Sequence, residues 1–424
     1  MCQAIPFPLA QGGEKATMSL SSRDLLDQAR AEIPEVDVSQ LNDVMQQEAQ
    51  HAVLDVREAD EVAQGLIPQA VHIPRGFLEL RVETLLPDRT RPITVYCAGG
   101  VRSLLAAKTL KAMGYSDVRS LKGGFGAWKD QGMPFRMPRA MTAEQKERYS
   151  RHFLLDEVGE EGQAKLLDAR VLLIGAGGLG APVAYYLAAA GIGTIGLVDF
   201  DRVERSNLQR QIFHTEDRIG MLKTESAAIA LKALNPEVKV IEHNIHLDGS
   251  NAGEIFEQYD IIVNGCDNFP TRYLANDVAV FLGKPMVDGG IFRFEGQVTT
   301  MIPWQSPCYR CRYPQPPPPE EAPSCAEAGV LGVLPGLVGT VQATEVIKLV
   351  LGVGQSLSGR LLHVDALSME FREFRLRRDP ECPVCGEHPT ITEPIDYEGF
   401  CTNPNVPAHA GAAEAILVGS GTLG

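Results

Sequence analysis

Residues 170–180, RVLLIGAGGLG, decide the fold of most of this chain. The segment up to Ile174 is mostly apolar and predicts a buried strand, and the residues after the glycines, 181–191, predict a helix. Glycines between a strand and a helix permit a tight turn and let a phosphate approach the helix N-terminus. The spacing is G-x-G-x-x-G, so we predict a nucleotide-binding loop at Gly175, Gly177, Gly178 and Gly180. A tight turn without a ligand is the alternative.

Strand-like and helix-like segments alternate downstream of this loop. They include TIGLVDFD (194–201), SAAIALKALNP (226–236), VKVIEHNI (238–245), YDIIVNGCD (259–267) and RYLANDVAVFLGKP (272–285). This alternation is typical of a doubly wound α/β fold. We therefore expect a Rossmann-like domain over residues 145–390. Asp199 ends the second predicted strand, where a carboxylate would hold ribose hydroxyls.

The residues after Asp199 favour a triphosphate over a dinucleotide. Asn207, Arg210 and Lys223 form a polar cluster, whereas a hydride-transferring enzyme needs an apolar site for nicotinamide. Cationic groups suit a triphosphate, whose charge must be neutralised during transfer. We interpret Gln211 and Glu216, in the same stretch, as part of a solvated loop.

Asp267, in the segment GCDNF, follows a predicted strand. A carboxylate at this position could hold Mg²⁺ on the bound phosphates. The alternative is that Asp267 is the N-cap of the next helix, since aspartate is also a preferred capping residue.

These motifs together resemble adenylyltransferases that activate sulfur-carrier proteins, relatives of the ubiquitin-activating enzymes. The similar segments are GAGGLG, LVDFDRVERSNLQRQ, GMLKTESA and CDNFPTRY, and the closest type is the molybdopterin-synthase adenylyltransferase. The resemblance implies that the C-terminal glycine of a ubiquitin-like carrier attacks ATP. It also implies that Asp199 binds ribose, that Asn207, Arg210 and Lys223 hold phosphates, and that Asp267 positions Mg²⁺. Arg151, in RYSRHFLL, would reach ATP from a neighbouring subunit, which implies a homodimer.

Two Cys-x-x-Cys pairs predict a metal site. The four cysteines are Cys308, Cys311, Cys382 and Cys385. Four thiolates make a closed structural Zn²⁺ site, although the long separation of the pairs leaves a redox dithiol or free buried thiols as alternatives. Because the family that this chain resembles places zinc at both motifs, the resemblance favours structural Zn²⁺.

Residues 97–103, CAGGVRS, predict a second active centre. Cys97 lies between a strand-like segment, ITVY, and a helix-like segment, so loop N–H groups and a helix N-terminus should favour its thiolate or a terminal persulfide. Arg102 would cap this loop and add positive potential. With LDVREADE and AVHIPRG, the loop resembles a rhodanese sulfurtransferase domain, which we place at residues 37–136. The alternatives are a phosphatase-like loop, which is usually wider, and an inactive domain with a buried Cys97.

The remaining cysteines and histidines receive weaker predictions. Cys325 follows a proline-rich run, and related enzymes have a cysteine at this motif that can link covalently to the carrier. We treat its role as open. We interpret Cys2, Cys266 and Cys401 as bystanders and His72 as structural.

Composition excludes several classes of protein. The 39 basic residues against 54 acidic ones give a net charge of −15, which disfavours nucleic-acid binding. The first twenty residues do not resemble a signal peptide, and residues 328–352 contain polar interruptions that favour a buried helix over a membrane span. Sparse cysteines favour a cytoplasmic location. We expect a loose leader at 1–36 that contains a helix around residues 22–31, a linker at 137–144 and a disordered tail at 391–424.

The two domains predict one pathway. The carrier, ending in Gly-Gly, would be adenylylated and then receive sulfur from a Cys97 persulfide, which thiosulfate or a cysteine desulfurase would load. Molybdopterin synthesis is the favoured purpose, and thiamine, cysteine or tRNA thiolation are alternatives. An NAD-binding oxidoreductase and a non-catalytic scaffold that docks carriers are alternatives from other classes. Whether Cys97 acts within its own chain or across a dimer stays open.

Overall fold

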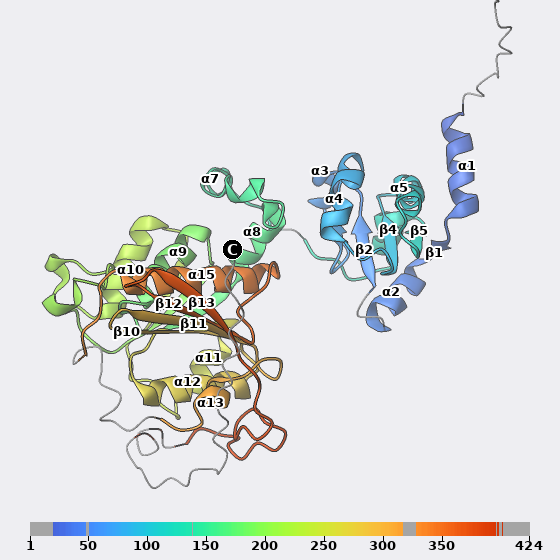
Figure 1. Cartoon of the computed structure of the whole chain (residues 1–424). Helices are drawn as coiled ribbons and strands as arrows, with labels where there is room; N and C mark the ends of the chain where they lie inside the picture. Colours follow the sequence, from blue (N-terminus) through green and yellow to red (C-terminus); the bar gives the residue numbers. More distant parts are fainter. Residues whose placement is uncertain are drawn as a thin grey trace, which may run out of the picture. The chain divides into compact units, whose positions relative to one another are not determined.

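The computed structural model describes residues 20–47, 51–137, 139–316 and 328–395, together with Tyr397 and Cys401. The chain divides into two compact units, Met1–Ala140 and Met141–Gly424, and this division falls inside the expected linker. Both units are drawn in Figure 1.

The first unit is built on a parallel sheet of five strands in the order β1-β5-β4-β2-β3. The central strands β2 and β4 are buried along their whole length, as their apolar sequences predict. The strands are β1 (Glu35–Val36), β2 (Ala52–Asp55), β3 (Val71–His72), β4 (Ile93–Tyr96) and β5 (Val118–Leu121).

Helices cover both faces of this sheet, so each face has its own core. Leu54 and Val95 face a core with α1, α4 and α5, while their neighbours Val53 and Tyr96 face a core with α2, α3 and α6. This alternation follows from the two-residue period of a strand. The helices are α1 (Ser22–Glu32), α2 (Val38–Gln47), α3 (Ala59–Val62), α4 (Leu78–Leu85), α5 (Val101–Ala112) and α6 (Gly124–Asp130), with a 3₁₀ turn, η1 (Arg75–Phe77).

The helix expected around residues 22–31 is confirmed as α1, but the expectation of a loose leader is wrong for residues 22–36. A capping box between Ser21 and Asp24 starts α1, and β1 pairs with β5 at the edge of the sheet. Ala29 and Ile33 are both buried against the first core. These two apolar side chains attach the segment to the unit.

The second unit has an eight-stranded sheet in the order β13-β12-β11-β10-β9-β6-β7-β8. Strands β10, β9, β6, β7 and β8 are parallel, and β11, β12 and β13 extend the sheet in antiparallel fashion. The bounds are β6 (Arg170–Ile174), β7 (Thr194–Val198), β8 (Lys239–His243), β9 (Ile261–Asn264), β10 (Met286–Phe292), β11 (Glu295–Met301), β12 (Arg360–Asp365) and β13 (Glu370–Arg375).

Helices also cover both faces of this second sheet. One core lies beneath α8, α9, α10 and α15, and the other beneath α11, α12 and α13. The helices are α7 (Ala143–Arg148), α8 (Gly159–Asp168), α9 (Gly180–Ala190), α10 (Lys223–Leu234), α11 (Ala252–Glu257), α12 (Phe269–Phe281), α13 (Tyr309–Arg312) and α15 (Leu334–Leu351), with 3₁₀ turns η2 (His152–Leu154), η3 (Arg205–Asn207) and η4 (Glu216–Arg218). The doubly wound α/β prediction is confirmed.

Two details of the second unit differ from expectation. The sequence of residues 144–167 is typical of one continuous helix, but the structure breaks it into α7, η2 and α8, and Gly159, with a φ of 55°, starts the last piece. Part of the expected disordered tail is ordered, because Tyr397 is buried and donates a hydrogen bond to Asp277.

One described helix, Leu334–Leu351, is long and apolar enough to cross a membrane by length and composition alone. Half of it is buried, and Val338 and Val346 belong to the core shared with α9. This packing agrees with the expected buried helix.

Candidate functional site

The glycine loop joins β6 to α9, as its sequence predicts. Gly175 has a φ of 97°, and a Cβ on Gly180 would lie 2.0 Å from the Gly175 carbonyl oxygen. These two positions therefore require glycine for the turn itself. Gly177 and Gly178 line an open cavity, where the absence of side chains leaves room for a ligand.

Asp199 follows β7 and also lines this cavity. Its carboxylate accepts hydrogen bonds from the Ala176 and Asp201 N–H groups, each at 2.9 Å. Burial raises the pKa of Asp199, and the nearby charge of Lys223 opposes that rise. The loop and the carboxylate are thus fixed to each other before any ligand binds.

The two cationic side chains predicted to bind phosphates reach the same cavity. Lys223, the first residue of α10, is mostly buried, and its ammonium group lies 2.7 Å from the Asp201 carboxylate. Arg210 lines the cavity and donates to the Ser206 carbonyl oxygen at 3.2 Å. The cavity therefore offers positive charge beside the glycine loop, as a polyphosphate requires.

Gln211 lies on the cavity wall, where we expected Asn207, and Asn207 does not. Asn207 is buried, its side-chain oxygen accepts from the Glu204 N–H at 3.1 Å, and it is not among the residues that line the cavity. Gln211, which we interpreted as part of a solvated loop, is 5% exposed and lines the cavity. Its side-chain oxygen has no hydrogen-bond partner among the described residues. An unsatisfied buried acceptor on a cavity wall indicates a group that faces a ligand, and no sequence motif pointed to Gln211.

Asp267 is exposed on the cavity wall, in the loop between β9 and α12. The capping alternative for this residue is wrong, because Asn268 caps α12 and accepts from the Thr271 N–H at 2.9 Å. Behind Asp267, the guanidinium of Arg272 donates to the carbonyl oxygens of Cys266 and Gly289. Asp267 is thus held at the sheet edge with its carboxylate available, which fits a Mg²⁺ ligand.

One cavity of about 970 Å³ therefore gathers most of the predicted nucleotide residues. It lies at the carboxyl ends of β6, β7 and β9, where ligands bind in open α/β sheets. The predicted residues on its wall are Gly175, Gly177, Gly178, Asp199, Arg210, Lys223 and Asp267. Gly180, Asn207 and Arg151 are not on this wall, and Arg151 is exposed in the segment between α7 and η2.

Of the other cysteines in the second half of the sequence and at its start, two lie in the structure at the cavity and two do not lie in the described residues. Cys266 and Cys401 line the cavity, and burial raises the pKa of Cys266 to about 11, so it stays a thiol near neutral pH. Cys2 and Cys325 lie outside the described residues.

Burial lowers the pKa of His214 to about 4. That histidine is therefore neutral, with ring nitrogens bonded to Ser226 and to the Ala176 carbonyl oxygen.

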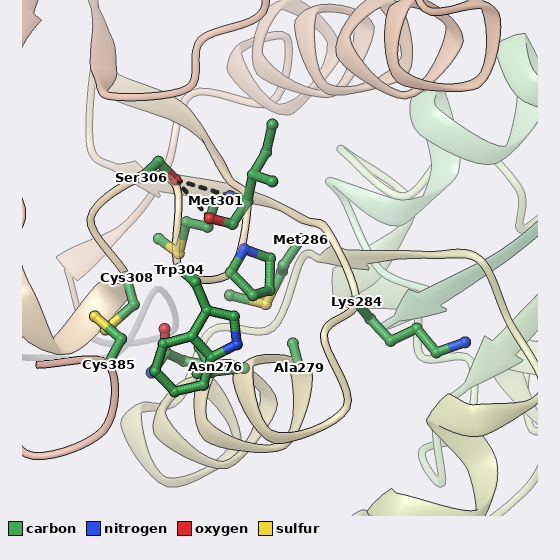
Figure 2. Close-up of a pocket in the computed structure, with 12 residues that line it drawn as sticks. Asn276, Ala279, Lys284, Met286, Met301, Trp304, Ser306, Cys308 and Cys385 are labelled. Atoms are coloured by element: carbon green, nitrogen blue, oxygen red, sulfur yellow. Dashed lines mark hydrogen bonds between the residues drawn. The ribbon is translucent and has the colours of Figure 1, made fainter. Parts of the chain in front are cut away.

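The two Cys-x-x-Cys pairs come together in the second unit. Their sulfur atoms all lie within 4.8 Å of one another, with Cys308 and Cys382 at 3.6 Å and Cys311 and Cys385 at 3.3 Å. Four thiolates bound tetrahedrally at about 2.3 Å from Zn²⁺ would be about 3.8 Å apart. Figure 2 shows Cys308 and Cys385 beside a small hollow lined by Trp304 and Met286. This arrangement fits a structural Zn²⁺ site.

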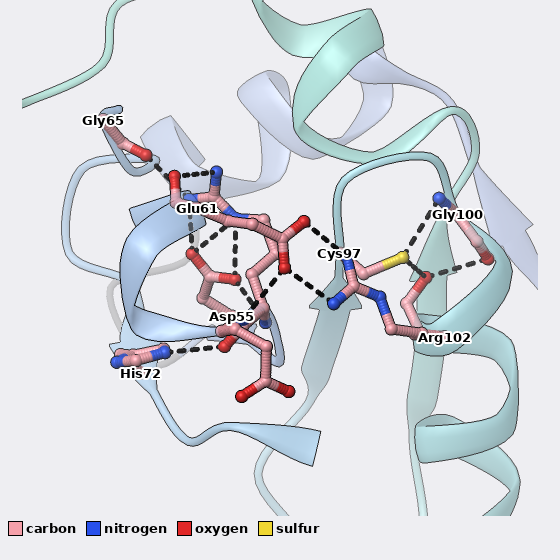
Figure 3. A network of polar contacts seen from close by, with 10 residues as sticks. Asp55, Glu61, Gly65, His72, Cys97, Gly100 and Arg102 are labelled. Carbon is pink, nitrogen blue, oxygen red and sulfur yellow. Dashed lines mark hydrogen bonds and ion pairs between the residues drawn. The ribbon is translucent and has the colours of Figure 1, made fainter. Parts of the chain in front are cut away.

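Cys97 follows β4 and precedes α5 in the first unit. The residue is 2% exposed, and its sulfur accepts from the Gly100 N–H at 3.1 Å. A Cβ on Gly124 would lie 2.2 Å from the Cys97 carbonyl oxygen, so the backbone at the start of α6 packs directly against the loop. Figure 3 shows the Cys97 sulfur facing Gly100.

Arg102 is held by a carboxylate that the sequence did not reveal. Both of its terminal nitrogens donate to Glu61 of α3, at 2.7 and 2.6 Å (Figure 3). This hydrogen bonding lowers the pKa of Glu61 to about 2, so the pair is fully ionised near neutral pH. His72 contacts the Arg57 carbonyl oxygen at 2.8 Å, which fits the structural role expected of it.

Comparisons with known proteins match both units. The ThiF family matches residues 149–384, and the rhodanese-like domain matches residues 37–131. A sulfur carrier protein adenylyltransferase from Thermus thermophilus is 52% identical over 265 residues, which cover 61% of this chain and 98% of that protein. The probable adenylyltransferase/sulfurtransferase MoeZ from Mycobacterium tuberculosis is 51% identical over 268 residues, covering 62% of this chain and 66% of that protein. The crystal structure of E. coli MccB with ATP has a TM-score of 0.51 at 25% identity, covering 58% of this chain and 75% of that chain.

Proposed function

The chain belongs to the ThiF family and carries a rhodanese-like domain ahead of it, and from this we propose a two-step conversion of a carrier protein. In the first step, the C-terminal glycine of a ubiquitin-like sulfur carrier is adenylylated. In the second step, sulfur from Cys97 turns that carboxyl group into a thiocarboxylate. The chain is an enzyme, an adenylyltransferase with sulfurtransferase activity, as its relatives' names describe.

The observation that carries the first step is one cavity that joins the glycine loop, the predicted cations Arg210 and Lys223, and the predicted carboxylates Asp199 and Asp267. The carrier's carboxylate is already ionised at neutral pH, so its attack on the α-phosphorus of ATP needs no general base. The attack forms an acyl-adenylate and releases pyrophosphate.

Each wall residue has a role in that attack. Asp199 would bind the ribose, and Arg210 and Lys223 would neutralise charge on the phosphates as pyrophosphate leaves. Asp267 would hold Mg²⁺, which supplies further neutralisation of the phosphate oxygens. Arg151 would complete the site from the partner subunit of a homodimer.

The second step uses the cysteine loop of the first unit. A donor, thiosulfate or the persulfide of a cysteine desulfurase, transfers one sulfur atom to Cys97. The terminal persulfide sulfur then attacks the activated carbonyl and displaces AMP, which leaves an acyl disulfide. A second thiol, Cys325 or a small reductant, attacks the Cys97 sulfur and releases the thiocarboxylate, so that a disulfide to Cys97 remains.

We place this activity in the cytoplasm, with structural Zn²⁺ at the four-cysteine group and without nucleic-acid or membrane partners. We propose molybdopterin synthesis as its purpose, since the sequence motifs resemble that type of adenylyltransferase most. Thiamine, cysteine or tRNA thiolation would use the same chemistry with another carrier.

The test measures ATP–pyrophosphate exchange with candidate carriers that end in Gly-Gly and then determines the mass of each carrier after a persulfide donor is added. We expect exchange with one carrier, followed by the mass of its thiocarboxylate. Asp267→Asn should reduce exchange by about a hundredfold. Absence of exchange with every carrier would favour the scaffold alternative, and NAD binding without exchange would favour the oxidoreductase.

A further inference from the structure

Two buried serines lie behind Cys97 and take no part in the proposed reaction. Ser103, in the first turn of α5, and Ser120, on β5, are both 0% exposed. Ser120 donates to the Ser103 hydroxyl at 2.9 Å, and Ser103 donates to the Gly100 carbonyl oxygen at 2.9 Å. The Cys97 thiol, in turn, donates to the Ser103 hydroxyl at 3.6 Å.

This order of donors suits Cys97 only while it is a thiol. A thiolate or a persulfide has no S–H group, so the Cys97 sulfur then only accepts hydrogen bonds. The Ser103 hydroxyl can then rotate, so that it donates its hydrogen to the Cys97 sulfur instead of to the Gly100 carbonyl oxygen.

The cations near the loop are each paired with a carboxylate, and Arg102 acts on Cys97 through its charge. Arg102 is neutralised by Glu61 through two hydrogen bonds, and Arg57 is paired with the Asp55 carboxylate at 2.6 Å. Glu58, near Arg102, adds only negative charge. The Gly100 N–H donates directly to the Cys97 sulfur, and the Ser103 hydroxyl is the neutral group next to it.

We propose that Ser103, oriented by Ser120, is a positioning residue that reverses its hydrogen bond to stabilise Cys97 when the sulfur becomes an anion. The thiol proton passes to water, and Ser103 keeps its own proton throughout. The Cys97 thiolate then attacks the outer sulfur of a donor persulfide, which forms the Cys97 persulfide and releases the donor thiolate. This inference rests on the proposed role of Cys97 as the sulfur carrier.

The test is the pH profile of Cys97 alkylation by iodoacetamide in the full chain, followed by mass spectrometry of the Cys97 peptide. In Ser103→Ala we expect the midpoint to move to higher pH and the rate at neutral pH to fall about tenfold, because a hydrogen bond to a charged group is lost. Ser120→Ala, which leaves the loop intact, should slow alkylation about two- to threefold. Ser103→Thr keeps the hydroxyl and should restore the midpoint.

Ser116→Ala is the matched control, because the Ser116 hydroxyl is exposed and donates only to the Arg89 carbonyl oxygen. Its midpoint should equal that of the unmodified protein. If Ser103→Ala disturbs the fold, as emission of the buried Trp128 would report, Ser120→Ala carries the test alone. A midpoint that does not move in the folded variants would overturn the proposal. A shifted midpoint in an enzyme that transfers no sulfur would support the serine pair and contradict the proposed function instead.

Discussion

Cys97 and the four-cysteine group are both buried, yet their surroundings prepare them for opposite tasks. The Cys97 sulfur faces a backbone N–H group and a buried hydroxyl, in a loop that only glycine residues can close. Cys308 and Cys382 instead face each other and a second cysteine pair. A sulfur atom that only accepts hydrogen bonds from its neighbours stays free to act as a nucleophile. Four converging sulfur atoms can instead coordinate a metal ion, and their coordinated lone pairs are then not available for nucleophilic attack. The neighbours of a cysteine, and not its burial, therefore decide what it does.

Cys97→Ala gives the largest expected effect and tests one side of this comparison. Sulfur transfer to the carrier should fall by at least about a thousandfold, because the nucleophile itself is lost. Adenylylation, measured by pyrophosphate exchange, should continue at the original rate, and the zinc content should not change. Loss of exchange would show that Cys97 also serves the first step.

Cys385→Ser tests the other side. Removal of one thiolate should release Zn²⁺, measured by metal analysis, and lower the melting temperature of the second unit by roughly 10 °C or more. Cys266→Ala is the control, since Cys266 is a buried thiol outside the cluster. Zinc retained at full stoichiometry in Cys385→Ser would contradict the metal site.

Gly124→Ala should damage the cysteine loop without touching the sulfur. An added Cβ would lie 2.2 Å from the Cys97 carbonyl oxygen at a φ of 57°. We expect the first unit to lose about 2–4 kcal/mol of its free energy of unfolding, measured by denaturant titration. Gly132→Ala is matched to it, because Gly132 has a φ of 69° but nothing within 4 Å of its Cβ position. That control should cost only about 1–2 kcal/mol. Equal losses would show that the loop adjusts freely.

Glu61→Gln gives the smallest effect and a distinctive pH dependence. The pKa of Glu61 is lowered to about 2 in the folded protein, chiefly by its hydrogen bonds to Arg102. The ion pair therefore stabilises the fold fully above the ordinary glutamate pKa, and this contribution is lost as the pH falls toward 2. The difference in the free energy of unfolding between the two proteins should shrink over that range. A constant difference across it would mean that Glu61 acts by packing.

The sequence predicted the parts of the fold that depend on local pattern. Local sequence alone was enough to predict the glycine loop, the apolar strands and the two cysteine motifs. It did not predict that residues 22–36 belong to the first unit, because this depends on the burial of Ala29 and Ile33 by distant segments. The same reason explains Asn207 and Gln211: both are buried polar side chains, but only Gln211 lies on the cavity wall, and local sequence does not distinguish the two.

The four-cysteine group has a mechanical consequence. With a metal bound, it fastens residues 308–311 to residues 382–385, so that α15, β12 and β13 lie within a closed loop of chain. A force applied at the two ends of the protein would bypass residues 312–381, whose full extension would otherwise add roughly 240 Å. Removing the metal would release that length in one step. The metal-bound four-cysteine group would thus limit how far the chain can be extended before the strands of its core separate.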